Sequence, residues 1–141
     1  MKLKIKMVTG GIPPVYKTKG AVCLDCYARL NETVSLKRGK RDKIPLGFCM
    51  GLPKNFEAVV RGRSGNTLSG LDVGIGTIDY DYTGEINAIL INNTDEDIEI
   101  NNGERICQIA VRKVPKVKLK FVEELKKTER GAGGFGHTGK K

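Results

Sequence analysis

Aspartates and tyrosines alternate in one short stretch of this chain, Asp79-Tyr80-Asp81-Tyr82, and a glycine lies near each end of it. Apolar residues precede and follow the glycines, and this pattern predicts a β-hairpin over residues 74–86 with the polar stretch at its tip. Carboxylates and aromatic rings at the tip of a rigid hairpin can be directed at a small molecule. The alternative is an ordinary polar turn, in which aspartate and glycine are also common.

A charged residue stands inside a second apolar stretch, residues 21–28, where Asp25 lies between Cys23 and Cys26. An aspartate in such a place must be ion-paired, hydrogen-bonded or close to a metal ion, and a satisfied structural carboxylate is the plain alternative. The two cysteines resemble half of a zinc site, but residues three apart in a strand point to opposite faces. No second cysteine pair accompanies them, and the only histidine is His137, so the pattern disfavours zinc.

Two further segments could bind phosphate. Residues 61–66, Arg-Gly-Arg-Ser-Gly-Asn, follow an apolar stretch and offer guanidinium groups, a hydroxyl and main-chain amides, although no P-loop lysine follows. The glycine-rich end of the chain, residues 130–141, contains Arg130, which can pair with a phosphate, and Phe135, which can stack on a flat ring. An ordinary turn and a plain mobile tail are the alternatives for these two segments.

The elements that must position these residues are predicted to be β-strands of one domain, because 141 residues is an ordinary domain size. Apolar or alternating stretches arrive at intervals of about ten residues, the spacing of an all-β sandwich or barrel. The 18 glycines suit the many turns of such a fold. Residues 122–129 have the composition of a helix, but of only a turn or two. The expected strands cover residues 3–7, 21–28, 33–36, 44–52, 57–61, 85–92, 98–100, 105–112 and 117–122.

The formal net charge of +9 is concentrated in the first half of the chain. Residues 1–70 carry 14 lysines and arginines against 4 acidic residues, whereas residues 71–141 carry 11 against 12. Such a distribution suits a polyanion or a nucleotide triphosphate. The basic run at residues 37–43 lacks interleaved aromatic residues and is expected to be a solvated loop, so we expect no stable nucleic-acid complex.

Membrane and secretion signals are not found in the sequence. No apolar stretch reaches the roughly 18 residues of a membrane span, and no signal-peptide pattern follows the basic start of the chain. Four cysteines are too few for a disulfide framework. We therefore expect a soluble intracellular protein, cytoplasmic or otherwise, with no membrane partner and with free thiols.

Taken together and in this order, the segments resemble the five motifs of the trimeric deoxyuridine triphosphate nucleotidohydrolases, the dUTPases. The resemblance covers nearly the whole chain. Residues 76–86 are similar to the third motif and residues 130–139 to the fifth, and these two matches are the strongest. Residues 62–65 are similar to the second motif, residues 103–109 to the fourth and residues 21–28 to the first.

The resemblance implies a jelly-roll subunit, a homotrimer whose three active sites are built from shared surfaces, and magnesium (Mg2+) as the cofactor. It implies hydrolysis of dUTP to dUMP and pyrophosphate, a reaction that limits uracil incorporation into DNA and supplies dUMP. Residues 1–129 would form the β domain, and residues 130–141 a mobile C-terminal arm that closes the active site.

The resemblance also implies roles for individual residues. Asp79 would be the general base for attack of water on the α-phosphorus, Tyr82 would pack against the deoxyribose, and Asp25 would hold magnesium through a water molecule. The residues that would line the uracil pocket through main-chain groups are Gly76, Thr77, Ile78 and Asn87. The residues that would position the phosphates or close the site are Arg63, Ser64, Gly65, Gln108, Arg130, Phe135 and Gly136.

Two other hypotheses stay open on the sequence. A dCTP deaminase shares the jelly roll but deaminates the base, and the Asp-Tyr-Asp-Tyr stretch with the glycine-rich tail favours the dUTPase chemistry over it. A non-catalytic nucleotide-binding jelly roll is the second, because function depends on the site and not on the fold. Two departures from the family pattern support it: Cys23 stands where glycine is usual, and His137 where serine or threonine is usual.

Overall fold

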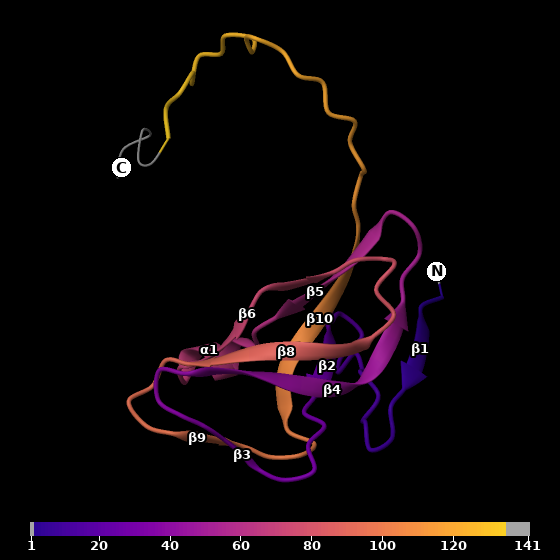
Figure 1. Ribbon diagram of the computed structural model, residues 1–141, viewed down its shortest axis with the longest axis vertical. Helices are drawn as coiled ribbons and strands as arrows, with labels where there is room; N and C mark the ends of the chain where they lie inside the picture. The colour runs from indigo at the N-terminus through magenta and orange to yellow at the C-terminus, as the bar shows by residue number, and fades with distance from the viewer. Residues whose placement is uncertain (1, 135–141) are drawn as a thin grey trace.

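The structure is a computed structural model that describes residues 2–134 of the chain. This part of the chain forms ten β-strands and one short helix (Figure 1), which confirms the predicted all-β class. In residues 2–134, no helix has the length and apolar character that crossing a membrane would require. In chain order the elements are β1 (Lys4–Met7), β2 (Leu24–Tyr27), β3 (Val34–Leu36), β4 (Arg41–Gly51), β5 (Phe56–Arg61), α1 (Ser64–Leu68), β6 (Leu71–Gly74), β7 (Gly76–Ile78), β8 (Glu85–Asn92), β9 (Ile98–Ile100) and β10 (Arg105–Lys113).

Two four-stranded antiparallel sheets make up most of the fold. One has the strand order β1-β4-β8-β6 and the other β2-β10-β5-β7, and a small sheet pairs β3 with β9. Strand β8 shows the alternation that such a sheet requires, since Ile86 and Leu90 are buried while Asn87 and Ile89 turn outward. The two large sheets therefore each contribute one apolar face to a common core.

The core fixes the two sheets against each other. Phe48 from β4, Leu90 from β8 and Ile106 and Ile109 from β10 belong to one continuous cluster, and each is at most 1% exposed. Complete burial of a side chain of this size contributes about 1.5–3 kcal/mol. A core of this kind gives the strand ends, and the residues that follow them, defined positions.

The predicted hairpin over residues 74–86 is more complex than a single turn. Strand β6 pairs with β8, as a hairpin requires, but β7 leaves that sheet and pairs with β5 in the other one. The change of sheet takes place at Ile75, which is 82% exposed between Gly74 and Gly76. The polar stretch therefore follows a strand that is paired in the second sheet, which fixes it more firmly than a free hairpin tip.

The basic run at residues 37–43 is only partly the loop that the sequence predicts. Lys37 and Arg38 form exposed ion pairs with Asp97 and Asp95. From Arg41 onward the chain is already in β4, because this part of the strand finds partners in β8. The expected beginning of the strand at residue 44 is therefore three residues too late.

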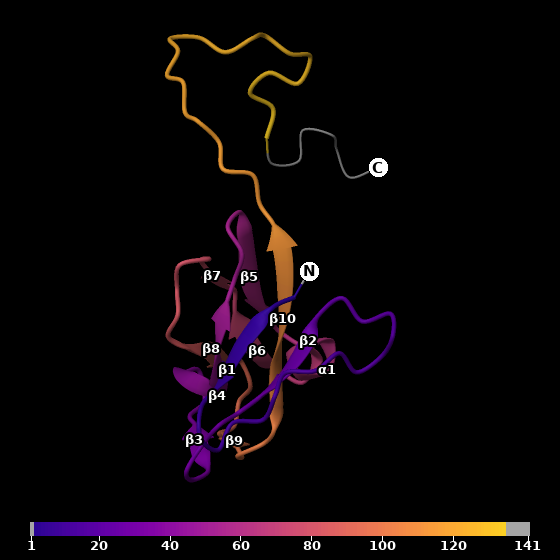
Figure 2. The ribbon, with the colours of Figure 1, turned by 90° about the vertical axis from the view of Figure 1, so that its right-hand side faces the viewer.

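Beyond β10 the described chain leaves the sandwich and runs away from it with no further helix or strand (Figures 1 and 2). The predicted strand at residues 117–122 and the helical turns at residues 122–129 are wrong for the single chain. A strand needs a hydrogen-bonding partner, and a helix of one or two turns is marginal alone. Val117, Leu119 and Phe121 consequently remain 71%, 78% and 92% exposed.

Candidate active site

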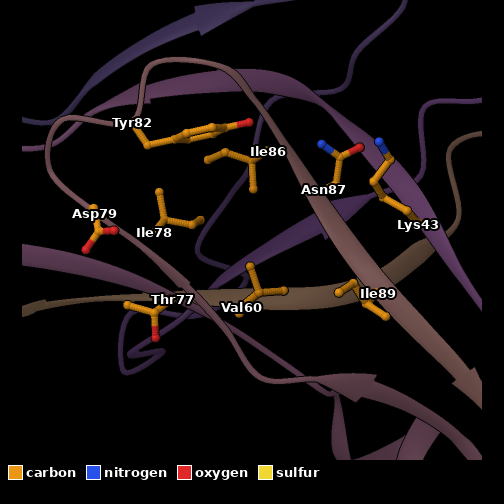
Figure 3. Close-up of a pocket in the computed structure, with 10 residues that line it drawn as sticks. Lys43, Val60, Thr77, Ile78, Asp79, Tyr82, Ile86, Asn87 and Ile89 are labelled. Atoms are coloured by element: carbon orange, nitrogen blue, oxygen red, sulfur yellow. The ribbon is translucent and has the colours of Figure 1, made fainter.

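A pocket of about 260 Å³ opens beside β7 and the turn that follows it (Figure 3). Its lining residues come from β4, β5, β7, β8 and that turn, and they are Lys43, Val60, Gly76, Thr77, Ile78, Asp79, Tyr82, Ile86, Asn87 and Ile89. Six predicted site residues are brought together here, and we call them the pocket group: Gly76, Thr77, Ile78, Asp79, Tyr82 and Asn87.

The floor of the pocket is apolar. Val60, Ile78 and Ile86 lie together in its middle, and Ile89 extends the apolar surface toward Lys43 (Figure 3). The first three are at most 8% exposed, so the core holds them in place. Such a floor suits a flat ring, whose orientation would then be set by the polar groups around it.

Strand β7 offers main-chain hydrogen-bonding groups that no other described strand uses. Gly76, Thr77 and Ile78 pair with β5 on one side, and β7 is the last strand of its sheet. N–H and C=O groups on the other side of an edge strand are free to pair with something else. Because the same three residues line the pocket, these groups can recognise the polar edge of a planar ligand.

Tyr82 and Asn87 are held by the same main-chain atom. The Tyr82 hydroxyl donates a hydrogen bond of 2.9 Å to the Glu85 carbonyl oxygen, and the Asn87 amide donates one of 2.8 Å to it. The Tyr82 ring lies above Ile86, while Asn87 lies farther along the pocket beside Lys43 (Figure 3). A Cβ at residue 84 would lie 2.6 Å from the Tyr82 hydroxyl oxygen, so glycine there allows the hydroxyl to reach the Glu85 carbonyl.

Asp79 follows β7 directly and lies at the end of the pocket opposite Lys43 (Figure 3). Its main-chain carbonyl accepts a hydrogen bond of 3.2 Å from the Tyr82 N–H, which closes the turn. Within residues 2–134 no ion pair engages its carboxylate. The carboxylate can therefore accept a hydrogen bond or a proton from a molecule in the pocket.

A second cluster of predicted site residues lies toward the β2 edge of the β2-β10-β5-β7 sheet. We call it the arginine group, and its members are Asp25, Arg63, Ser64, Gly65 and Gln108. Asp25 accepts a hydrogen bond of 3.0 Å from Arg105, and its other oxygen lies 3.8 Å from Nε of Arg63. The Gln108 amide donates a bond of 2.7 Å to the Gly62 carbonyl. These contacts confirm that Asp25 is a paired carboxylate, and they gather two guanidinium groups around it.

The pocket group and the arginine group do not meet within one chain. Asp25 belongs to β2 and Asp79 directly follows β7, and these strands are the two edges of a four-stranded sheet. Three strand intervals of about 4.8 Å already separate them by roughly 14 Å across the sheet, and the offset along the strands adds to this distance. One phosphate group cannot touch both aspartates of the same chain.

Asp25, the predicted magnesium residue, supplies one carboxylate ligand but not a complete magnesium site. Magnesium commonly takes one or two protein carboxylates and completes its coordination with phosphates and water, so a single Asp25 carboxylate fits that pattern. Residues 2–134 contain no group of three histidine, cysteine or acidic side chains that could hold a metal unaided. The ion would therefore need a phosphate ligand to stay bound.

Cys26, next to Asp25, is unsuited to ligand chemistry. Cys26 on β2 stands opposite Cys107 on β10, and both are fully buried. The interaction of its side chain with that of Cys107, together with burial, raises the pKa of Cys26 far above its ordinary value. Cys26 therefore remains a protonated thiol that packs in the core.

The last three predicted site residues belong to the C-terminal segment. Arg130 lies in the described part, where its Nε donates a hydrogen bond of 2.8 Å to the Gly133 carbonyl. The segment after β10, to which it belongs, runs away from the sandwich (Figures 1 and 2). Phe135 and Gly136 lie outside the described residues, as does His137.

Lys43, Val60 and Ile89 line the pocket but are missed by sequence reasoning. Lys43 and Ile89 are direct partners across β4 and β8, and Val60 is the partner of Gly76 across β5 and β7. No local motif marks them, because only strand pairing brings them to the pocket. The apolar alternation of residues 86–91 is the one signal from which Ile89 could have been placed on the outer face.

A β-sandwich with a pocket for a flat ring and a separate cationic group is suited to a nucleotide. The family described as dUTPase matches residues 11–139 of the chain. A deoxyuridine 5'-triphosphate nucleotidohydrolase of Rhizobium rhizogenes is 43% identical over 132 residues, which cover 89% of this chain and 84% of that one. The corresponding protein of Treponema denticola is 42% identical over 142 residues, 99% of both chains. The chain belongs to the dUTPase family.

Solved structures agree with this assignment at the level of the fold. The structure is similar to the dUTPase of Staphylococcus bacteriophage 80alpha, determined with dUpNHpp, with a TM-score of 0.90 and 24% identity over 98% of both chains. It is also similar to a dUTPase of phage phi11 of S. aureus in which a structural Mg(II) ion is coordinated, with a TM-score of 0.83 and 19% identity over 90% of this chain and 100% of that one. The predicted jelly-roll fold is confirmed.

Proposed function

We propose that this chain hydrolyses dUTP to dUMP and pyrophosphate. The observation that carries the proposal is the position of Asp79, an unpaired carboxylate at the mouth of a pocket with an apolar floor and a free strand edge. Membership in the dUTPase family supports it, and the relatives' names state the same substrate.

The base would bind in the pocket. Uracil presents O4 as an acceptor and N3–H as a donor, whereas cytosine has a donor and an acceptor at these places. Main-chain groups of Gly76, Thr77 and Ile78 on the free edge of β7 would pair with uracil and mismatch cytosine, with Asn87 completing the set. Tyr82 would pack against the deoxyribose and leave no space for a 2′-hydroxyl.

The reaction is an in-line displacement at the α-phosphorus. Asp79 would orient a water molecule and accept one of its protons while the water oxygen bonds to the phosphorus. The bond from the α-phosphorus to the bridging oxygen breaks, and pyrophosphate leaves with that oxygen. When bound, magnesium (Mg2+) would neutralise charge on the triphosphate, and Asp25 would hold it through a water molecule.

The arginine group would bind the phosphates. Arg63 already donates 3.0 Å and 3.4 Å hydrogen bonds through Nη1 to neutral oxygens of Arg105 and Asn66. A phosphate is a stronger acceptor for a guanidinium than these oxygens are. Ser64 and Gly65 would add a hydroxyl and a main-chain amide, and Gln108 would keep the Gly62 carbonyl in place.

A homotrimer would bring the two groups together. The separation of at least roughly 14 Å between Asp25 and Asp79 in one chain supports sites shared between subunits. A second support is the segment after β10, where exposed Leu119, Phe121 and Leu125 find no cover in a single chain. Residues 130–141, with Arg130, Phe135 and Gly136, would form an arm that closes the shared site over the nucleotide.

A pyrophosphate-release assay tests the proposed function. The chain is incubated with dUTP, dCTP, dTTP and UTP in turn, with and without magnesium. We expect release from dUTP alone and only with magnesium, and light scattering should give the mass of a trimer. Release from no nucleotide, or ammonia release from dCTP, would contradict the proposal. In the cell such activity would limit uracil incorporation into DNA and supply dUMP.

A further inference from the structure

Arg29 and Glu85 form the most complete ion pair of the described chain. Arg29 donates two parallel hydrogen bonds, from Nε to Oε1 at 2.8 Å and from Nη2 to Oε2 at 2.9 Å. The Gly47 N–H adds a third, to Oε1 at 3.0 Å. Both side chains are only about a quarter exposed, so the pair is partly shielded from water. The hydrogen bonds from Arg29 lower the pKa of Glu85, although partial burial opposes the shift.

The ion pair occupies a gap in the sheet. Strand β8 pairs with β4 at Asn87 and Pro45 and again at Glu85 and Cys49, but the register shifts in between. Pro45 has no N–H to donate to the ladder, and Gly47 has a φ of 78°. Strand β4 therefore bulges here, and regular pairing with the beginning of β8 is interrupted. The Arg29 N–H donates to the Pro45 carbonyl at 2.9 Å, which ties the same bulge to the ion pair.

The beginning of β8 matters for the pocket because of the Glu85 carbonyl oxygen. It accepts hydrogen bonds from both Tyr82 and Asn87, which belong to different ends of the pocket (Figure 3). We propose that Arg29 is a positioning residue of the active site, acting through the main chain of Glu85 on Tyr82 and Asn87. Arg29 does not line the pocket and touches no substrate.

This inference rests on the proposed function, and it concerns the selection of deoxyribose. If Arg29 is replaced, Glu85 is held only by an interrupted ladder and by the single hydrogen bond from the Gly47 N–H, and the Tyr82 ring loses its fixed place beside the sugar. A tyrosine ring without a fixed place excludes a 2′-hydroxyl less well, and we expect Arg29→Met to lower the preference for dUTP over UTP about tenfold. The KM for dUTP should rise while kcat changes little, because ground-state contacts are lost.

Kinetics of Arg29→Met on dUTP and UTP test the inference with two controls. Arg38→Met removes an arginine from the exposed pair with Asp95, and Ile100→Val weakens the core far from the pocket. Neither control should change the preference or the KM. Arg29→Lys should restore part of the preference, because lysine keeps the charge but not the two-pronged contact. An unchanged preference in Arg29→Met, or an equal change in Ile100→Val, would overturn the inference.

A double-mutant cycle tests whether the effect passes through Tyr82. Tyr82→Phe removes the hydroxyl that bonds to the Glu85 carbonyl and keeps the ring. In a Tyr82→Phe background, Arg29→Met should change the preference for dUTP over UTP by less than about twofold. A full tenfold loss in both backgrounds would show that Arg29 acts elsewhere.

NMR separates this inference from the proposed function, because it needs no turnover. The chain has 4 tyrosines, and Tyr82→Phe identifies the ring signals of Tyr82. We expect these signals to shift or broaden in Arg29→Met but not in Arg38→Met, even if the parent chain fails to hydrolyse dUTP. Unchanged Tyr82 signals in Arg29→Met would disprove the positioning role whatever the activity assays give.

Discussion

The pocket group and the arginine group are built in opposite ways. The pocket group comes from one stretch of twelve residues, 76–87, and it surrounds an open cavity with unused main-chain groups. The arginine group comes from three distant parts of the chain. Asp25 already accepts a hydrogen bond from Arg105, and Arg63 and Gln108 already donate to carbonyl oxygens. One region is shaped for a ligand in advance, whereas the other must exchange internal contacts for those of an anion. We therefore expect substitutions in the pocket group to lower catalytic activity steeply and substitutions in the arginine group to lower it less.

The largest effect is expected for Asp79→Asn in the pocket group. An amide cannot accept the proton of the attacking water, so kcat should fall by at least about 10²-fold. Binding of dUpNHpp should be nearly unchanged, because Asp79 makes no ion pair that the substitution would break. Steady-state kinetics and calorimetry measure the two quantities. A variant within about tenfold of the parent rate would remove Asp79 from the role of general base.

A smaller loss is expected for Arg63→Met in the arginine group. A hydrogen bond from a charged group is worth about 1.5–3 kcal/mol, and a loss of about 2 kcal/mol corresponds to about a 30-fold fall in kcat/KM. Arg38→Met, which removes an equal charge far from the site, should retain the parent value. Equal losses in the two variants would mean that Arg63 contributes only general positive charge.

Removal of the proposed C-terminal arm should lower kcat/KM moderately. A chain that ends at Glu129 lacks Arg130, Phe135 and Gly136, and without closure we expect kcat/KM to fall at least about tenfold, or about 1.4 kcal/mol. The melting temperature without ligand should stay the same, because residues 130–132 are exposed and the segment lies outside the sandwich. Phe135→Trp gives a companion signal, since the chain has no tryptophan and the indole fluorescence should respond to dUpNHpp. Full activity of the shortened chain would argue against an arm.

The smallest effect concerns acid stability at the edge of the pocket. Arg29 lowers the pKa of Glu85 in the folded chain, so the ionised pair stabilises the fold above about pH 4.3, the ordinary pKa of a glutamate. This stabilisation should disappear as the pH falls from there through the lowered pKa, and it should amount to at most about 1 kcal/mol for a partly exposed pair. Glu85→Gln should flatten this part of a melting-temperature profile. An identical slope in the two proteins would contradict the linkage.

The sequence predicts a feature correctly where a local pattern is sufficient. It does not predict a feature that depends on which strands pair in the sheets. The pocket group is predictable because its residues are close in sequence and their types are unusual. Ile75 gives no sign that the chain changes sheets there, because that depends on which strand lies beside β7. Ile5 and Met7 alternate as in a half-buried strand, but both remain more than a third exposed because β1 is an edge strand. Lys43 reaches the pocket only through the β4–β8 register.

The central claim is that each active site combines the pocket group of one copy with the arginine group of another. Mixing two inactive variants tests it most directly. One chain carries Asp79→Asn, and the second carries Asp25→Asn with Arg63→Met. The two are refolded together in equal amounts, and dUTP hydrolysis is compared with that of each variant alone. Random assembly of shared sites should restore about a quarter of the parent activity, because about that fraction of sites receives both groups intact. A mixture no more active than its separate components would contradict the claim.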